Sequence, residues 1–256
     1  MISNMFDAEK KLNELIIEIR EWFQKNGPQA TAVLGISGGK DSTVAAAVLA
    51  RALGKDRVLG VMMPNGVQKD IDDSKKVIEA LGIRALEVNI GIPYHTMLDA
   101  LAILTSDDAK VNLQPRLRMA ALYLVAQSLP EGGRVINTCN RSEDYVGYAT
   151  KFGDCAGDMS VLGNLLVSEI LAIGDIMPEI PTELVHKAPS DGLWGDTDED
   201  RFGFTYAQLE DYIMEGTSGD AEVDAKIEKM HRTSRHKYEP MYFCSEPTAA
   251  KEVIHD

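Results

Sequence analysis

Short apolar runs alternate with helical segments along the first half of the chain. The runs cover residues 30–36, 57–63, 84–88 and 133–138. Apolar residues at consecutive positions over so short a stretch are typical of strands that are buried on both faces. The segments between the runs carry apolar residues at helical spacing. This alternation predicts an α/β protein with a Rossmann-like open parallel sheet and helices on both faces.

The C-terminal third has a different pattern, because the strand signal fades from about residue 155 and helical spacing continues. We expect helices over residues 7–25, 43–53, 71–81, 95–104, 117–129, 165–173, 179–187, 205–214 and 220–235. No linker composition or repeat divides the sequence. We therefore expect a single domain over residues 1–256, with an α/β core at 28–140, a mainly helical part at 141–240 and a tail at 241–256.

Charge and cysteine content exclude several classes of function. The 256 residues include 26 Lys+Arg and 40 Asp+Glu, which gives a formal net charge of −14. Such an acidic surface repels a phosphate backbone, so nucleic acid is not an expected partner. No apolar run is long enough to cross a bilayer, and the N-terminus lacks the basic start of a signal peptide. Three widely spaced cysteines favour reduced thiols in a cytoplasmic protein.

A glycine-rich turn follows the first apolar run, at residues 35–42 (GISGGKDS). Two adjacent glycines let several amides converge on one anion at a helix N-terminus. The turn is not a Walker A loop, because Leu34 and Asp41 stand where that motif needs Gly and Ser or Thr. A carboxylate among phosphate-binding amides is favourable when Mg²⁺ lies between carboxylate and phosphate. A tight turn without a ligand is the alternative.

Ser-Gly-Gly-x-Asp-Ser after a buried strand resembles the pyrophosphate loop of the N-type ATP pyrophosphatases. These enzymes cleave ATP between its α- and β-phosphates and form adenylates. The resemblance implies that ATP is bound by Gly35, Ile36, Ser37, Gly38, Gly39, Lys40, Asp41 and Ser42. In parallel sheets, ligands bind beyond the carboxyl ends of the strands. We expect loops 37–42, 64–70 and 138–144 to border one crevice.

Four further stretches are similar to the NAD synthetase family, over roughly residues 30–240. Residues 112–119 (NLQPRLRM) resemble its Asn-x-x-x-Arg-x-Arg-Met segment, which implies that Arg116 contacts deamido-NAD. From the residues alone, a solvated helix face is the alternative for Arg116. Residues 137–143 (NTCNRSE) resemble its Gly-Thr-x-x-x-x-Glu segment, with Asn137 in place of the usual glycine. This implies that Thr138 contacts ATP and that Glu143 shares a magnesium ion with Asp41.

Residues 147–158 (GYATKFGDCAGD) are similar to the family's Gly-x-x-Thr-Lys-Tyr-Gly-Asp-x-x-x-Asp. The resemblance implies that Lys151 and Asp158 bind deamido-NAD. From its position we expect Asp154 to hold an ammonium ion or to accept its proton. We accordingly expect the catalytic residues to be Asp41, Lys151 and Asp154.

Residues 187–199 (KAPSDGLWGDTDE) resemble a further family segment and imply that Ser190 contacts ATP. Asp198, Glu199 and Asp200 are either a metal cluster or a solvated acidic loop. Near the end, His236 and Lys237 match a His-Lys pair that closes over the dinucleotide. We expect loop 64–70 and segment 188–202 to order over the substrates.

Two departures from the family pattern concern phosphate contacts. Val167 stands where the family often has a phosphate-contacting lysine, so Lys40 or Lys187 would substitute for that cation. Asp196 replaces the usual glutamine before Thr197.

The implied reaction is ATP-dependent amidation of deamido-NAD through an acyl-adenylate, which releases AMP and pyrophosphate and uses Mg²⁺. Ammonia is the expected nitrogen donor, because the first strand begins at about residue 30 and leaves no room for an amidase domain. Members of the family are homodimers, and the helix expected at 117–129 is apolar on more than one face, which suits an interface. The alternatives are a tRNA-thiolating or GMP-forming N-type ATP pyrophosphatase, a non-catalytic adenine-nucleotide binding module, and an α/β domain of unknown role.

Overall fold

Five parallel strands form the centre of the protein in a computed structural model, which describes residues 6–67, 71–101, 105–187 and 197–244. The strands are β1 (Thr31–Gly35), β2 (Val58–Met62), β3 (Arg84–Glu87), β4 (Gly133–Asn137) and β5 (Met159–Ser160). Their order in the sheet is β3-β2-β1-β4-β5, and each neighbouring pair is parallel. The chain proceeds from β1 towards one edge and then crosses to the other side at β4. The carboxyl ends of β1 and β4 therefore flank the point where the strand order reverses.

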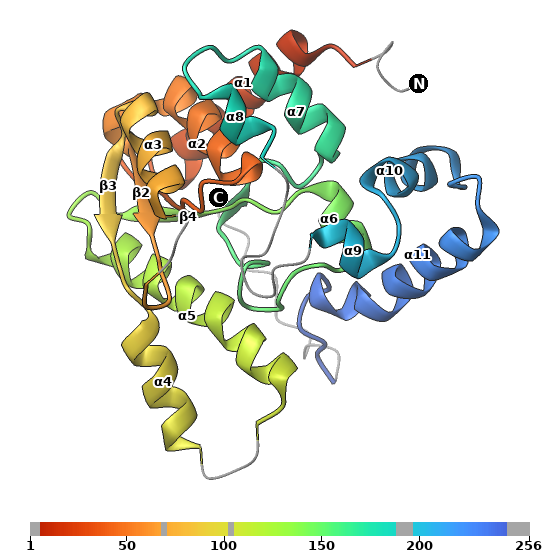
Figure 1. The fold of residues 1–256 in the computed structure, drawn as a ribbon. Helices are drawn as coiled ribbons and strands as arrows, with labels where there is room; N and C mark the ends of the chain where they lie inside the picture. Colours follow the sequence, from red (N-terminus) through yellow and green to blue (C-terminus); the bar gives the residue numbers. More distant parts are fainter. Residues whose placement is uncertain (1–5, 68–70, 102–104, 188–196, 245–256) are drawn as a thin grey trace, which may run out of the picture.

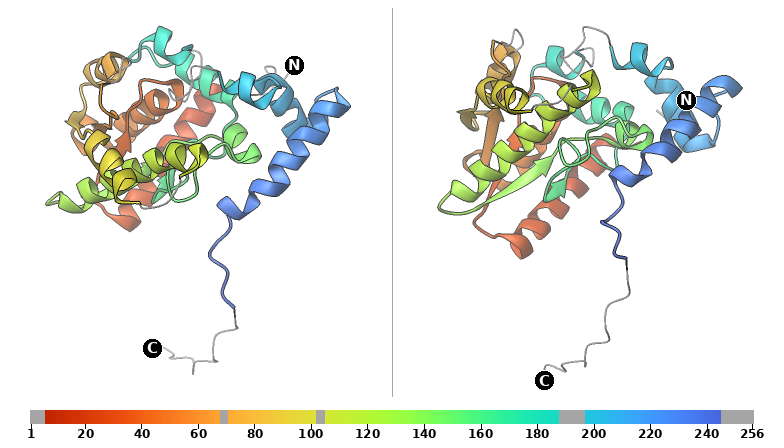
Figure 2. Two further views of the ribbon diagram at one scale, coloured as in Figure 1. Left: turned by 60° about the horizontal axis from the view of Figure 1, so that its bottom comes forward. Right: turned by 90° about the horizontal axis from the view of Figure 1, so that it is seen from below.

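Helices cover both faces of the sheet, as the alternation predicted (Figure 1). On one face lie α2 (Lys40–Leu53) and α3 (Ile71–Leu81), and α1 (Ala8–Asn26), α7 (Val167–Asp175) and α8 (Thr182–Val185) pack against α2. On the other face lies α5 (Asp107–Ser128), which contacts β1 and β4 and pairs with α4 (Gly91–Ala100). Figure 2 shows α5 and α1 on opposite sides of the sheet.

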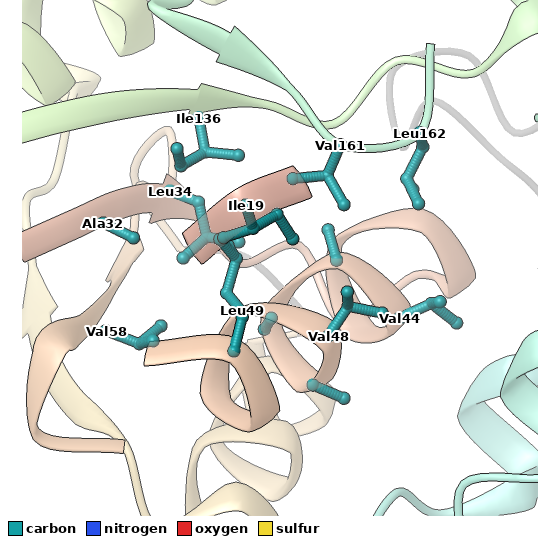
Figure 3. Packing of buried hydrophobic residues seen from close by; sticks show 14 of the residues in the cluster. Ile19, Ala32, Leu34, Val44, Val48, Leu49, Val58, Ile136, Val161 and Leu162 are labelled. Carbon is teal, nitrogen blue, oxygen red and sulfur yellow. The ribbon is translucent and has the colours of Figure 1, made fainter. Parts of the chain in front are cut away.

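The main core lies between the sheet and α2 (Figure 3). Leu34 of β1 and Leu49 of α2 are fully buried there, and Ile136 of β4 is nearly so. Side chains alternate between the faces of a strand. Val33 accordingly packs on the opposite face, in the cluster that includes Ala126 of α5. This double burial holds the end of β1, and hence the glycine-rich turn, in a fixed position.

A smaller cluster beside the sheet holds the C-terminal helices together. Its helices are α6 (Arg141–Val146), α9 (Asp198–Phe202), α10 (Tyr206–Glu215) and α11 (Ala221–Ser234), followed by a short 3₁₀ turn at Arg235–Lys237. Phe202 is fully buried at its centre and contacts Tyr148, Phe204 and Tyr206 through ring packing. Figure 1 shows α10 and α11 to one side of the sheet, with α6 and α9 between them and the strands.

Several element boundaries differ from those predicted. The helix expected at 117–129 begins ten residues earlier, at Asp107, and runs through Pro115. Ser106 caps this helix through its hydroxyl, and the proline ring packs against Gly153. The helix therefore continues through Pro115, although this residue has no N–H to donate within the helix. As a result, Arg116 and Arg118 lie within a helix rather than beside a turn.

The other differences concern short elements. The helix expected at 95–104 is α4, which begins at Gly91 and ends at Ala100. The helix expected at 179–187 is limited to Thr182–Val185. Helices α6 and α9 and strand β5 were not predicted, because they are too short to show the periodic spacing of apolar residues that marks a helix or a strand. Within the described ranges, no helix combines the length and the apolar character needed to cross a bilayer.

Candidate functional site

A cavity of about 590 Å³ opens at the carboxyl edge of the sheet. Its wall includes the turn after β1, Met63 and Pro64 after β2, and Thr138 and Cys139 after β4. These segments were predicted to border one crevice, and the cavity brings them together. Residues 68–70 of the second loop lie outside the described residues. The cationic side chains in its wall are Lys40, Arg118, Lys187, Arg201 and Lys237. The same wall carries carboxylates, from Asp41, Asp108, Glu143, Asp154 and Asp198, so the cavity offers charges of both signs to a ligand.

The glycine-rich turn supplies one wall of this cavity. Every residue from Gly35 to Ser42 lines it except Gly38, which faces α3 instead. Gly38 has φ +77°, and a Cβ on it would lie 2.7 Å from the Cβ of Asp73. Gly39 caps α2 without a side-chain hydrogen bond. The free amides of the first helical turn therefore point towards the cavity, as an anion site requires.

Two serines fix the shape of this turn. The Oγ atoms of Ser37 and Ser42 lie 3.1 Å apart, and the backbone N–H of Ser37 donates to Ser42 Oγ at 3.2 Å. Ser37 Oγ in turn accepts from the N–H of Gly39 at 3.2 Å. The bonds close the turn on itself before any ligand binds. The loop is therefore preorganised for an anion.

Two carboxylates share one cation beside the turn. Lys40 Nζ lies 2.8 Å from Asp41 Oδ2 and 3.9 Å from Glu143 Oε1. Asn140 fixes both acids, because its amide donates to Asp41 Oδ1 at 3.2 Å and its side-chain oxygen accepts from the N–H of Glu143 at 2.9 Å. Asp41 and Glu143, predicted from separate segments, are thus close enough to hold a common cation.

Burial and charge shift the protonation of this group. Burial, followed by the nearby charge of Asp41, raises the pKa of Glu143 to about 8. Burial alone would lower the pKa of Lys40, but the charges of Asp41 and Glu143 outweigh it and raise that pKa. The ammonium form of Lys40 is therefore the stable one. Within the described residues, no three Asp, Glu, His or Cys side chains gather as a closed metal cluster. Two carboxylates in an open site suit Mg²⁺, which keeps waters and takes further ligands from phosphates.

The acidic residues 198–200 do not form the metal cluster that was one interpretation of the sequence. Asp200 accepts from the hydroxyl of Thr197 at 2.6 Å and caps α9. Glu199 accepts the N–H of Tyr206 at 2.8 Å. Asp198 is buried, lines the cavity and accepts the hydroxyl of Tyr206 at 3.1 Å. The three carboxylates therefore accept hydrogen bonds from three different groups, of which two belong to Tyr206.

Asp154 faces the cavity from the loop that follows α6. Its carboxylate accepts the N–H of Thr150 at 2.7 Å, and its backbone oxygen accepts Asn137 Nδ2 at 2.5 Å. Thr150 is held in turn by Asn112 of α5, through a 2.6 Å bond. Burial raises the pKa of Asp154 above its ordinary range, against the opposing effect of the hydrogen bonds from Thr150. A higher pKa makes this carboxylate a stronger proton acceptor.

Other predicted residues lie around the cavity rather than in its wall. Arg116 donates to the backbone oxygen of Lys151 at 3.2 Å. The ammonium of Lys151 contacts the backbone oxygen of His236. Asp158 accepts the N–H of Val135 at 2.7 Å and lines a second, smaller cavity of about 260 Å³. Arg116, Lys151 and His236 are thus linked by contacts, Asp158 lies at the second cavity, and none of the four lines the main cavity.

Lys237, in contrast, reaches the wall of the main cavity. Its ammonium donates to the backbone oxygens of Gly147 and Ala149 at 2.6 and 2.8 Å. The Nδ1–H of His236 donates to the backbone oxygen of Thr233 at 3.1 Å, and His236 is exposed. The predicted ATP contact Ser190 lies outside the described residues.

Val167, which was expected to stand in the place of the family's phosphate-contacting lysine, lies away from the cavity wall. It is buried at the start of α7, where its N–H donates to Ser142 Oγ at 3.2 Å. Both suggested substitutes, Lys40 and Lys187, line the cavity. Lys187 also bonds Asp73 of α3 at 2.9 Å.

Sequence reasoning did not single out three of the residues that line the cavity. Arg118 donates to the backbone oxygen of Met63 at 3.1 Å, and burial lowers the pKa of its guanidinium. Arg201 and Tyr148 come from the C-terminal helical part. Arg118 stands in the quoted Arg-x-Arg pair, so the sequence carried a signal for it. The other two lie in segments whose place beside the sheet depends on tertiary packing.

Comparisons with known proteins agree on one family. The family model described as NAD synthase matches residues 11–241. The NH3-dependent NAD+ synthetase of Pyrococcus furiosus is 36% identical over 244 residues, which cover 89% of this chain and 93% of the relative. That of Thermoplasma acidophilum is 37% identical over 230 residues, which cover 87% and 93%.

Solved structures include an NMN synthetase from Francisella tularensis with a similar fold. It has a TM-score of 0.85 and 34% identity, and the match covers 93% of this chain and 98% of that one. The family match spans the sheet, the glycine-rich turn and the C-terminal helices that build the cavity. The chain therefore belongs to the NAD synthase family.

Proposed function

We propose that the protein amidates the carboxylate of deamido-NAD with ammonia and ATP, and thereby forms NAD, AMP and pyrophosphate. The observation that carries this proposal is the family match over residues 11–241, together with relatives that are named NH3-dependent NAD+ synthetases. The cavity supports it, because a glycine-rich anion site, two carboxylates and an acidic residue with a raised pKa meet there.

The first step joins the two anionic substrates. A carboxylate oxygen of the nicotinate ring attacks the α-phosphorus of ATP, the bond to the β-phosphate oxygen breaks, and pyrophosphate leaves with the electron pair. The amides at the start of α2, in residues 40–42, are placed to hold the departing phosphates. Asp41 and Glu143 would hold Mg²⁺, which supplies charge neutralisation for the phosphates when it is bound. Most of the rate comes from positioning two anions that repel each other.

The second step replaces AMP by ammonia at the activated carbonyl carbon. Ammonia forms the C–N bond, AMP leaves, and the nitrogen loses a proton. Asp154 is the acceptor that we assign, because this residue lines the cavity and its pKa is raised. The dinucleotide would be bound by five further residues, namely Lys151, Arg116, Asp158, His236 and Lys237. ATP would be contacted by Thr138 and Ser190.

Replacing Asp154 by asparagine keeps the shape of the side chain and removes its basicity. We expect the rate at limiting ammonium to fall about a hundredfold. Raising the pH increases the share of free ammonia and should partly restore the rate. Asp211→Asn on the exposed face of α10 is the control. Full activity of Asp154→Asn at low ammonium would remove this residue from the mechanism.

A second candidate substrate is nicotinate mononucleotide. The specific observation in its favour is the similarity to an NMN synthetase, at a TM-score of 0.85 and 34% identity. Both acids carry the same nicotinate carboxylate, so the chemistry of the site is unchanged. Discrimination between deamido-NAD and nicotinate mononucleotide would therefore depend on residues outside the main cavity, such as Arg116, Lys151 and Asp158.

One assay tests the reaction and separates the two substrates. The protein is incubated with ATP, Mg²⁺ and ammonium, and either deamido-NAD or nicotinate mononucleotide is added. We expect NAD and AMP in equal amounts from deamido-NAD, and little product when glutamine replaces ammonium. A higher kcat/KM with the mononucleotide would support the second candidate. If neither deamido-NAD nor nicotinate mononucleotide leads to AMP, the proposal is contradicted.

We further propose that the protein is a homodimer. Its support is the face formed by α4 and α5, where large apolar side chains are exposed. Ile92 on α4 is 82% exposed and Leu124 on α5 is 68% exposed. Large apolar side chains exposed on two helices that pack together are typical of a protein–protein interface.

A further inference from the structure

Lys40 occupies an unusual place for a lysine in a nucleotide-binding turn. It lies at the first position of α2, and its side chain is only 4% exposed. Its ammonium is bonded to Asp41 at 2.8 Å, lies 3.9 Å from Glu143 and stands 5.5 Å from the centre of the Tyr206 ring. A buried lysine of this kind is tolerated because its charge is paired.

The groups around this ammonium are mostly acidic. Beyond Asp41 and Glu143, the buried carboxylate of Asp198 also acts electrostatically on Lys40. The hydroxyl of Tyr206 lies 3.1 Å from Asp198 Oδ2 and 3.5 Å from Glu143 Oε1. A single hydroxyl proton cannot neutralise several carboxylates. Lys40 therefore supplies the positive charge that lets the acids lie close together.

The same two acids are those that would hold magnesium. A magnesium ion binds carboxylate oxygens directly and demands near-ideal octahedral geometry. The ammonium of Lys40 already lies between the oxygens of Asp41 and Glu143, within 4.0 Å of both. Two cations so close in a buried site repel each other strongly. Either the metal or the ammonium can be in this position, but not both.

The side chain of Lys40 has a nearby alternative partner once a nucleotide is present. Lys40 belongs to the turn that lines the anion site. Because the stem of a lysine side chain is long and flexible, its ammonium can reach a phosphate bound there. The position that corresponds to the family's phosphate-contacting lysine holds the buried Val167. Lys187 already bonds Asp73. A triphosphate would therefore attract the ammonium of Lys40 as the metal takes its place.

We propose that Lys40 is a placeholder cation: it fills the metal position between Asp41 and Glu143 in the resting enzyme and moves to the phosphates when ATP and the metal bind. The proposal rests on the proposed function, since it concerns the same ATP site. It predicts two opposite changes in binding affinity for a variant that lacks the positive charge of Lys40. Free metal should bind more tightly to that variant, and the metal–nucleotide complex more weakly.

The test uses Lys40→Met, which keeps most of the stem, and Lys75→Met as control. Lys75 pairs with Asp72 on the exposed side of α3. Binding of Mn²⁺ without nucleotide is measured by electron paramagnetic resonance. We expect Lys40→Met to bind free Mn²⁺ at least about tenfold more tightly than the wild type or Lys75→Met. Adding Mg²⁺ should raise the Tm of Lys40→Met more than that of the wild type.

The second half of the test adds a nucleotide that cannot be cleaved, α,β-methylene-ATP. We expect its Mn²⁺ complex to bind Lys40→Met about tenfold more weakly than wild type, because a phosphate contact is lost. Unchanged binding of free Mn²⁺ to Lys40→Met, or unchanged binding of the complex, overturns the proposal. If Lys40→Met does not fold, the wild type alone decides. It should bind free Mn²⁺ at least about tenfold more weakly than the complex, and equal affinities overturn the proposal.

These measurements are independent of the overall reaction. If the wild type forms AMP from a nicotinate nucleotide but Lys40→Met binds free Mn²⁺ with the same affinity as the wild type, the proposed role of Lys40 is wrong and the proposed enzyme activity stands. If Mn²⁺ binding changes as expected but no pyridine acid gives AMP, the placeholder stands and the substrate assignment is wrong.

Discussion

Gly38 illustrates how one residue sets the shape of the site. It adopts a left-handed backbone, and an added Cβ would lie 2.9 Å from the backbone carbon of Asp73 and from the backbone nitrogen of Ser74. No other amino acid fits this position without moving α3. The adjacent glycines were predicted to aim amides at an anion. The structure assigns Gly38 to packing and leaves Gly39 and its neighbours at the cavity.

Gly38→Ala should therefore impair ATP binding as well as stability. We expect the KM for ATP to rise about tenfold, because the turn must shift to relieve the contacts. Gly216→Ala is a matched control, since Gly216 also has positive φ (82°) but has nothing within 4 Å of an added Cβ. The control should lower the free energy of unfolding by about 1–2 kcal/mol and leave the KM unchanged. An unchanged KM for Gly38→Ala would show that the turn is not the ATP site.

Helix α1 shows how an element far from the site supports it. Its inner face packs on α2, the helix that begins at the glycine-rich turn. Ile19 is 1% exposed on this face, whereas Ile17 on the same helix is 54% exposed. We expect Ile19→Ala to lower the free energy of unfolding by about 2–5 kcal/mol. Ile17→Ala should change it by less than about 0.5 kcal/mol. Chemical denaturation measures both, and similar losses would contradict this packing.

The amino ends of the strands are joined by an ion pair. Glu131, just before β4, accepts Arg84 of β3 at 2.9 Å and the hydroxyl of Thr31 of β1 at 3.0 Å. The bond to Arg84, then local hydrogen bonds, lowers the pKa of Glu131 to about 2, from 4.5. A lowered carboxyl pKa stabilises the folded state above the ordinary pKa, and this contribution is lost as the pH falls.

Glu131→Gln should remove that pH dependence. We expect the variant to have a lower Tm than the wild type at pH values above about 4.5, and the two Tm values to converge as the pH falls towards about 2. The difference should be small and should shrink in high salt, because the pair is at the surface. Thermal unfolding across this pH range measures it. A gap in Tm that stays constant with pH would contradict the assignment.

The whole molecule presents an apolar face on α4 and α5 that suits a second copy of the chain. We expect the wild type to sediment at twice 28.1 kDa. A charge at Leu124, introduced by Leu124→Asp, should produce monomers, because an unpaired carboxylate would be buried in the interface. Ile17→Asp, an exposed position on the opposite side of the sheet, should remain dimeric. A dimeric Leu124→Asp would place the interface elsewhere.

The sequence by itself determined the parallel sheet, because buried strands and amphipathic helices have distinct apolar periods. It also placed the glycine-rich turn at the carboxyl edge of the sheet, because parallel strands end at one edge, and the family resemblance pointed to the pair Asp41 and Glu143. The division into residues 28–140, 141–240 and 241–256 and the roles of Lys151 and Ser190 stay predictions.

Only the tertiary structure decided what lies between those elements. The position of Lys40 between two acids, the burial of Asp198 beside Tyr206 and the helix through Pro115 depend on contacts between segments far apart in the sequence. Local periodicity carries no information on such contacts, because they form when separate helices pack against the same sheet edge. Short elements such as α6 and β5 owe their conformation to that packing as well.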